Sequence, residues 1–353
     1  MNFGLPYKGS KNLLAQRILD CIPSASVFVD LFCGGCAVSH AALLSGRFAR
    51  VVVNDIEGDL SRLFVAAVNG QYKGESRWIS REDFFRLKES DPYVRYCWSF
   101  GNNGRDYIYS EAVEPYKRAL HYAVVFGDFA VLRRLCPLVS DAAEKALAGL
   151  ASRKARRIEV GRAIVRRLKQ VGKPEDLKNN PLFGQIRLRD GGVVRKESLE
   201  SLERLQSLES LQSLESLERL QSLECLERLQ SLERLERLQS LESLESLERL
   251  QSLEMDYRDV QLPDGCVVYC DPPYAGTNGY GLHKSAFDQE AFWNWARKCE
   301  RLLFISEYSA PVDFVPIEEV PHRSRLSATT NNSVTERLFV HESRYNELKT
   351  RLI

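Results

Sequence analysis

The tetrapeptide Asp271-Pro272-Pro273-Tyr274 could bind and orient an amino group attached to a nucleobase. It follows the apolar stretch 265–270 (GCVVYC), which predicts a buried strand. A ring amine is a poor nucleophile because its lone pair is delocalised into the ring. The carboxylate of Asp271 and the carbonyl oxygen of Pro272 could each accept one N–H of that amine, and the prolines would stiffen the loop. Tyr274 offers a stacking face for a base outside the duplex. A proline-rich turn that caps the strand is the structural alternative.

Two motifs after earlier apolar stretches point to a nucleoside ligand. Gly34 and Gly35 follow the stretch 26–32 and would let a ligand approach the backbone at the carboxyl edge of a sheet. Asp55 comes just after the stretch 49–53, where an acid can accept hydrogen bonds from ribose hydroxyls. The spacing GxGxxG is absent, so no pyrophosphate cradle is expected. A plain tight turn and a helix N-cap at Asp55 are the structural alternatives.

The N-terminal stretch 6–11 (PYKGSK) adds two candidate ligand contacts. Lys11 could pair with a carboxylate and Tyr7 could pack on a ligand, whereas a surface loop is the alternative. The spacing of His and Cys residues offers no metal site, so no metal is expected. Cys33 and Cys36 form a CxxC pair in the glycine turn without a second pair, and we expect the nine cysteines to be reduced thiols.

The elements that must position these residues alternate between strand and helix. This order predicts an α/β fold with a parallel, doubly wound sheet, which a large insertion over about 75–254 splits in sequence. The predicted helices are 12–20, 36–45, 57–70 and 286–299, and the predicted strands are 26–32, 49–53, 265–270, 301–306 and 335–340.

Residues 198–254 are 19 triplets of the form (Ser/Arg)-Leu-(Glu/Gln), with Cys225 as one variant. On a helix a three-residue step drifts by about 60°, so a helix of this length would not keep its leucines on one side. A strand has period two and also fails. We therefore predict a small solenoid with its leucines inside, and a long or broken helix is the alternative. A passive, expandable insert is the expected role, and an arm that contacts DNA or a partner is the other.

The charge of the chain is unevenly distributed. The repeat carries 13 Glu and 6 Arg, which leaves the remainder with 43 basic and 35 acidic residues. A basic body is compatible with a nucleic-acid partner. The sequence shows neither an apolar run long enough to span a membrane nor a secretory signal, so we expect a cytoplasmic protein without a membrane partner.

In this order the motifs resemble those of the DNA adenine methylase (Dam-like) family, the alpha-class N6-adenine DNA methyltransferases. The resemblance covers residues 1–74 and 255–341 and differs from the usual glycines at Ser10 and Cys36. It implies a Rossmann-like methyltransferase sheet, S-adenosylmethionine as methyl donor and double-stranded DNA as partner. It also implies a catalytic group of Asp271, Pro272 and Tyr274, and cofactor contacts from Tyr7, Lys11, Gly34, Asp55, Asp256 and Asp271.

The resemblance divides the chain into three parts. Residues 1–74 and 255–353 would form the S-adenosylmethionine-binding catalytic domain, 75–197 a mostly helical target-recognition region, and 198–254 the repeat insert. Methylation of N6 of adenine in DNA is the predicted activity. N4-cytosine methylation and an inactive, methylase-like interaction protein are the alternatives, and glutamine methylation usually has Asn in place of Asp271. A monomer is expected, and a restriction endonuclease is a possible partner.

The region between the motifs holds the candidate DNA contacts. Residues 140–170 predict a helix, and 153–173 carry nine Lys or Arg against one acid, Glu159. This stretch could contact phosphates or form a solvated helix face. Residues 96–103 (YCWSFGNN) could line the pocket, fill the space left by an extruded base, or belong to the core. Residues 322–336 predict a polar loop near DNA.

Overall fold

The computed structural model describes residues 3–7, 9–135, 137–147, 149–171, 229–242, 248–274, 287–323 and 333–351. The chain separates into two compact units. Unit 1 comprises Met1–Glu75, Phe84–Asp106 and Arg237–Ile353, and unit 2 comprises Ser76–Asp83 and Tyr107–Glu236. No helix within the described ranges is long and apolar enough to cross a membrane.

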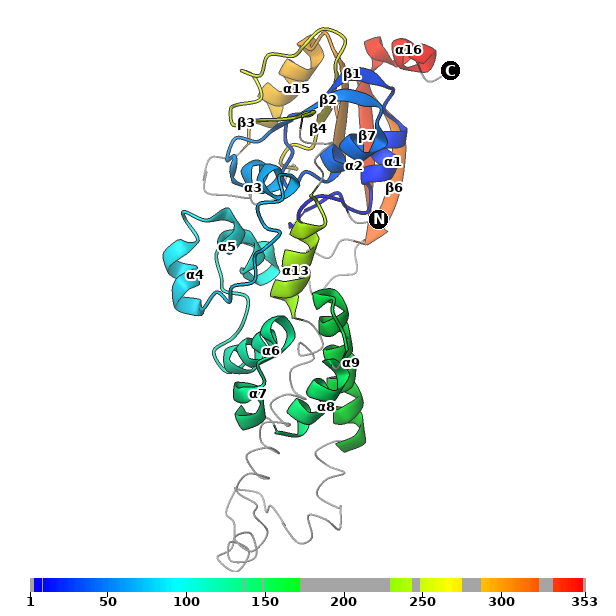
Figure 1. Cartoon of the computed structure of the whole chain (residues 1–353). Coiled ribbons are helices and arrows are strands. Elements are labelled where there is room, and N and C mark those ends of the chain that lie inside the picture. The colour runs from blue at the N-terminus through cyan, green and yellow to red at the C-terminus, as the bar shows by residue number, and fades with distance from the viewer. Residues whose placement is uncertain are drawn as a thin grey trace, which may run out of the picture. The chain divides into compact units, whose positions relative to one another are not determined.

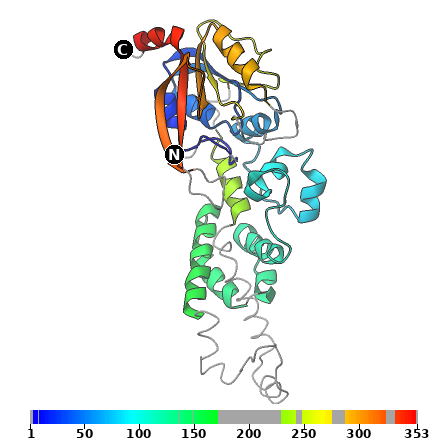
Figure 2. The same cartoon turned by 180° about the vertical axis from the view of Figure 1, so that it is seen from behind.

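Unit 1 is built on a sheet whose described strands number seven, in the order β3-β2-β1-β4-β5-β7-β6 (Figures 1 and 2). Strands β3, β2, β1, β4 and β5 run parallel, and β7 is antiparallel to both β5 and β6. The α/β class is confirmed, whereas the antiparallel strands β7 and β6 depart from the parallel sheet that was predicted. The strands are β1 Ala25–Asp30, β2 Phe48–Asn54, β3 Leu250–Leu253, β4 Val267–Cys270, β5 Leu302–Glu307, β6 Phe314–Arg323 and β7 Ser333–His341.

Helices cover both faces of this sheet (Figure 1). Right-handed crossovers place α2 and α3 on one face and α15, which joins β4 to β5, on the other. Val29 and Phe292 pack in the core on the α15 side, while the ring of Phe28 lies 5.2 Å from that of Phe48. The helices of unit 1 are α1 Ala15–Asp20, α2 Ala37–Ser45, α3 Asp59–Val68, α5 Pro92–Cys97, the short 3₁₀ helix Phe100–Asn102, α15 Gln289–Lys298 and α16 Glu342–Arg351.

The polar loop predicted over 322–336 is wrong at both of its ends. Strand β6 continues to Arg323, and β7 begins at Ser333; residues 324–332 lie outside the described residues. Two prolines, Pro316 and Pro321, weaken the strand signal of β6. Proline has no N–H to donate to a neighbouring strand. The strand tolerates both prolines because it lies at the edge of the sheet, where one side has no neighbouring strand.

The predicted solenoid does not form where the repeat is described. Residues Gln230–Gln239 form helix α13, and Leu250–Leu253 form the edge strand β3 beside β2. Within three turns the leucines of α13 drift by only about 120°, so one buried face can hold them. Those leucines, Leu232, Leu235 and Leu238, are all buried. A three-residue spacing of leucines is thus incompatible with one buried face on a long helix but compatible with it on this short one.

The described part of unit 2 is largely helical. The helix predicted over 140–170 is two helices, α8 and α9, because the chain between them includes Gly149 with φ +80°. Whether the region up to residue 197 is also helical remains a prediction, because 172–197 lie outside the described residues. The helices here are α6 Glu114–Phe126, α7 Ala130–Leu135, α8 Pro137–Leu147 and α9 Arg153–Val171; α4 Arg81–Leu87 and α13 run from one unit into the other.

Candidate active site

Asp271 lies directly after β4, at the carboxyl edge of the parallel strands. Its Oδ2 is 3.0 Å from Nζ of Lys11, and the carboxylate is 19% exposed. The other oxygen, Oδ1, is buried and accepts no hydrogen bond within the described part of the chain. Burial raises the pKa of Asp271 to about 6, although the Lys11 ammonium acts in the opposite direction. The site therefore holds a carboxylate with one oxygen available to a ligand.

The N-terminal segment brings Lys11 and Tyr7 to this edge. The N–H of Leu5 donates to the carbonyl oxygen of Gly35 at 2.7 Å. Gly4, with φ +61°, makes this approach possible, because a Cβ there would lie 2.3 Å from the same oxygen. The ring of Tyr7 then packs beside the glycine turn. The role of Gly4 was not predicted, because its only signal in the sequence is a glycine two residues before the stretch 6–11.

The glycine turn is tied to the end of β2. Asp55 accepts hydrogen bonds from the N–H of Gly34 through Oδ2 and from the N–H of Glu57 through Oδ1, both at 3.1 Å. Helix α3 begins at Asp59 with Gly58 as its N-cap, so Asp55 does not cap it. Burial raises the pKa of Asp55. The carboxylate supports the turn, and its remaining lone pairs can accept further hydrogen bonds.

Cys36 occupies the position where the family typically has its last glycine. Its φ of 55° lies in the left-handed region that favours glycine. The N–H of Cys36 donates to the carbonyl oxygen of Cys33 at 2.6 Å, which closes the turn before α2. The backbone thus keeps the conformation expected of a glycine there, and the departure in sequence does not alter the turn.

Asp256 follows β3, at the same edge of the sheet as Asp55 and Asp271. Its carboxylate accepts hydrogen bonds from Arg258, at 2.8 Å from Nε and 2.7 Å from Nη2, and these bonds lower the pKa of Asp256. The adjacent Tyr257 is buried, with its ring 5.2 Å from that of Phe32. The three predicted acids thus lie at one edge of the sheet. Contact between Asp256 and a cofactor remains a prediction.

Two acids that sequence analysis did not assign also belong to this region. Asp30, at the end of β1, accepts a hydrogen bond from Ser39 at 2.5 Å, and burial raises its pKa to about 7. Glu336, on β7, lies 3.1 Å from Nζ of Lys11 and accepts a hydrogen bond from the hydroxyl of Tyr274 at 2.9 Å. An acid inside an apolar strand was the available signal for Asp30, whereas Glu336 was placed in the predicted polar loop.

Tyr274 presents only part of its ring to a ligand. Nζ of Lys11 lies 4.6 Å from the ring centroid, and the ring of Tyr308 meets it edge to face at 4.6 Å. The side chain amide of Gln289 donates to the carbonyl oxygen of Pro273 and fixes the loop. The predicted catalytic residues and Lys11 therefore form one cluster.

The stretch 96–103 divides into a buried and an exposed part. Tyr96 and Trp98 are buried, and the ring of Tyr96 lies 6.0 Å from that of Tyr7. Phe100 is 65% exposed on a turn held by hydrogen bonds, among them Phe100 N–H to the carbonyl oxygen of Asp106 at 2.7 Å. The core interpretation holds for the first residues, and Phe100 remains a candidate contact for DNA.

Some of the basic residues predicted to face phosphates are used inside unit 2. Arg157 binds the carboxylates of Glu233 and Glu236, with N–O distances of 2.8 and 2.9 Å. Arg156 donates to main-chain carbonyl oxygens of α6. The side chains of Arg162 and Arg166 are each 67% exposed, so these two residues remain candidate contacts for DNA phosphates.

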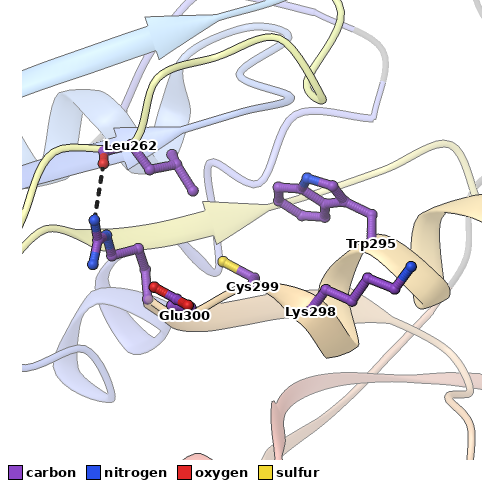
Figure 3. A pocket seen from close by; sticks show the side chains of 6 residues that line it. Leu262, Trp295, Lys298, Cys299 and Glu300 are labelled. Atoms are coloured by element: carbon purple, nitrogen blue, oxygen red, sulfur yellow. Dashed lines mark hydrogen bonds between the residues drawn. The ribbon is translucent and has the colours of Figure 1, made fainter.

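A shallow hollow of about 210 Å³ lies on unit 1 (Figure 3). Its lining comes from α15, the chain that follows it and Leu262 before β4, and the guanidinium of Arg301 donates to the carbonyl oxygen of Leu262 at 3.4 Å. None of the predicted site residues lines the hollow, so we assign it no part in the site. The lining residues are Leu262, Trp295, Lys298, Cys299, Glu300 and Arg301.

The residues present suit a positively charged nucleoside ligand. Oδ1 of Asp271, which is buried and has no hydrogen-bond partner among the described residues, and the carboxylate of Asp55 follow β4 and β2, the two strands that flank β1 and its glycine turn. Carboxylates favour both ribose hydroxyls and a nearby cation. S-adenosylmethionine has both features, so the donor set fits it.

Comparison with known proteins adds a family. Residues 7–136 match the family model described as D12 class N6 adenine-specific DNA methyltransferase. A search of curated proteins gave no match. The matched stretch contains Tyr7, Lys11, Gly34 and Asp55 and ends before Asp271. The match confirms the family resemblance and the predicted enzyme class, adenine-specific methylation of DNA, while the roles of single residues remain predictions.

Proposed function

We propose that the enzyme methylates adenine in double-stranded DNA with S-adenosylmethionine as donor, a proposal supported by the match of residues 7–136 to the D12 class N6 adenine-specific DNA methyltransferase model. The observation that carries this mechanism is the Asp271 carboxylate, held by Lys11 through Oδ2 while Oδ1 stays available. When bound, S-adenosylmethionine supplies an electrophilic methyl group on a sulfonium.

Asp271 and its loop would orient the target amine. Oδ1 of Asp271 accepts one N–H of the adenine amine, and the carbonyl oxygen of Pro272 accepts the other, which directs the nitrogen lone pair at the methyl group. One side of the Tyr274 ring faces Lys11, so the base stacks on the remaining surface. After transfer, the nitrogen loses a proton to Asp271 Oδ1. Catalysis then depends mainly on positioning and electrostatics.

Two groups of residues would bind the partners of this reaction. Tyr7, Gly34, Asp55 and Asp256 hold the donor at the carboxyl edge of the sheet, with Asp55 accepting hydrogen bonds from the ribose hydroxyls. Phe100 is large, apolar and exposed on a turn held by hydrogen bonds, which suits filling the space that the extruded base leaves in the duplex.

Substitution of Asp271 tests this function. We expect Asp271→Ala to lose nearly all transfer of labelled methyl groups from S-adenosylmethionine to duplex DNA, with the fold retained. The matched control is Asp264→Ala, because Asp264 is 96% exposed on the same unit and should leave the rate unchanged. Digestion of the product DNA should yield N6-methyladenine. Recovery of N4-methylcytosine, or full activity of Asp271→Ala, would overturn the proposal.

The pH dependence gives an independent test. Asp271 can take the proton of the methylated amine and accept hydrogen bonds through both oxygens only as a carboxylate, and its pKa is raised to about 6. The rate should therefore be highest above pH 6 and fall as the pH drops through that value. A rate that stays constant down to pH 5 would contradict the role of Asp271.

A further inference from the structure

Glu336 shares the Lys11 ammonium with Asp271. Nζ of Lys11 lies 3.0 Å from Asp271 Oδ2 and 3.1 Å from Glu336 Oε1, and the same Oε1 accepts the hydroxyl hydrogen bond of Tyr274. Glu336 is 6% exposed. One cation thus lies between two carboxylates that come from different parts of the sequence, β7 and the loop after β4.

We propose that Glu336 is a positioning residue for methyl transfer, which draws Lys11 and the Tyr274 hydroxyl to itself and so leaves Asp271 able to grip the amine. This inference rests on the proposed function of Asp271. Without the charge of Glu336, the ammonium would pair with Asp271 alone. Asp271 would then be a poorer acceptor for an N–H, because its electron density would be committed to Lys11.

The charges around Asp271 determine how its pKa would change if Glu336 lost its charge. Burial raises the pKa of Asp271, Lys11 lowers it, the negative charge of Glu336 raises it, and the hydroxyl of Tyr274 lowers it. Burial by itself lowers the pKa of Lys11, but the two carboxylates together raise it above its ordinary value, so Lys11 stays charged. Loss of the Glu336 charge should therefore lower the pKa of Asp271.

The other titratable groups that face Asp271 come from its own loop and from two strands. They are the Tyr274 hydroxyl on the loop, Asp30 on β1, and Tyr269 and Cys270 on β4. Burial raises the pKa of all four groups, for Asp30 to about 7. Of these groups, only Asp30 titrates near the pKa of Asp271, and it is unchanged in the variants proposed below.

The test compares Glu336→Gln with the wild-type enzyme. Glutamine keeps the shape and an acceptor for Tyr274 but removes the charge. We expect kcat to fall about tenfold to a hundredfold, the effect of a misplaced catalytic group, with little change in KM for S-adenosylmethionine. The acidic limb of the kcat profile should move to lower pH. A merely structural role would leave that limb in place.

Two further variants keep the test decisive. Glu319→Gln removes a charge from the neighbouring strand β6, where Glu319 is 54% exposed and pairs with Arg337, and it should behave as wild type. Glu336→Asp keeps the charge, so its acidic limb should stay at the wild-type pH even if Glu336→Gln fails to fold. A wild-type rate and limb for Glu336→Gln, or a shifted limb for Glu336→Asp, would refute the inference. An inactive wild-type enzyme would instead refute the proposed function.

Discussion

The same six residues, Arg-Leu-Gln-Ser-Leu-Glu, adopt two conformations in this protein. At 237–242 they complete helix α13 and the turn after it, and at 249–254 they contain the edge strand β3. Leu, Arg, Gln and Glu all favour helix. The helical copy therefore follows its local preference, whereas the strand copy is imposed by the rest of the fold.

Equivalent side chains make equivalent interactions in the two copies. Arg237 donates to the carbonyl oxygens of Phe3 and Gly4, and Arg249 donates to those of Leu43 and Phe48. The glutamates also correspond, because each pairs with a basic side chain on the chain that follows β2. The pairs are Glu242 with Lys73 and Glu254 with Arg62. The repeat supplies arginines that cap carbonyl groups in either backbone conformation, so its last copies are structural parts of unit 1.

The leucines of the two copies differ most in burial, and they give the largest expected effect. Leu238 is fully buried in α13, whereas Leu250 is half-buried in β3. Leu238→Ala should lower the free energy of unfolding by about 2–4 kcal/mol, and Leu250→Ala by about 1 kcal/mol, because a deeper site loses more contacts. Urea unfolding measures both, and equal losses would show that the two copies are packed alike.

The arginines should separate stability from ligand binding. Arg237→Met and Arg249→Met should each cost about 1.5–3 kcal/mol, because each leaves main-chain carbonyl groups without a charged donor. Of the two arginines, Arg237 is the one that binds the segment leading to Tyr7 and Lys11. Calorimetric titration with S-adenosylhomocysteine should therefore show weaker binding for Arg237→Met alone. Weaker binding for Arg249→Met as well would remove this distinction.

The glutamines should respond with opposite sign to one substitution. The Gln239 amide donates to the carbonyl oxygens of Tyr72, Lys73 and Glu75, whereas the side chain of Gln251 is exposed on the edge strand. Gln239→Val should cost about 1 kcal/mol through lost hydrogen bonds. Gln251→Val should raise stability by about 0.5 kcal/mol, because β-branched residues suit strands. Thermal unfolding compares the pair, and a loss in both would mean that β3 has no strand preference.

The glutamates should give the smallest effect. Both ion pairs are partly exposed, so Glu242→Gln and Glu254→Gln should each cost at most about 1 kcal/mol. The cost should shrink further at 1 M salt, because the charges are then screened. A loss that is large or independent of salt would show that one glutamate does more than pair with its partner.

Patterns within a few residues predicted the centre of the sheet. β1, β2, β4 and β5 are short apolar runs, and the polar residues after them, Asp55 and Asp271, lie at the expected edge. Lys11 was expected to meet a carboxylate, and it meets two. The strands were predicted because each apolar run is a local signal, whereas the carboxylates that Lys11 meets lie far from it in the sequence.

The parts that sequence analysis missed depend on distant partners. Nothing within one triplet distinguishes the copy that becomes a strand from the copy that becomes a helix. Strand β3 forms because β2 offers a parallel edge, with Val52 opposite Gln251. Glu336 was not predicted for a related reason, because its place in the site depends on pairing with Lys11, which lies far away in the sequence.

Asn54 holds the residue that follows the last copy of the repeat. Its side chain accepts a hydrogen bond from the N–H of Met255 at 3.2 Å and donates to the carbonyl oxygen of Met255 at 3.0 Å. Coding sequences this repetitive can gain or lose whole units when they are copied. Because the clamp holds the residue just after the final unit, such a change upstream would leave an identical strand beside Asn54. The sheet would thus keep its edge strand while the repeat changes in length.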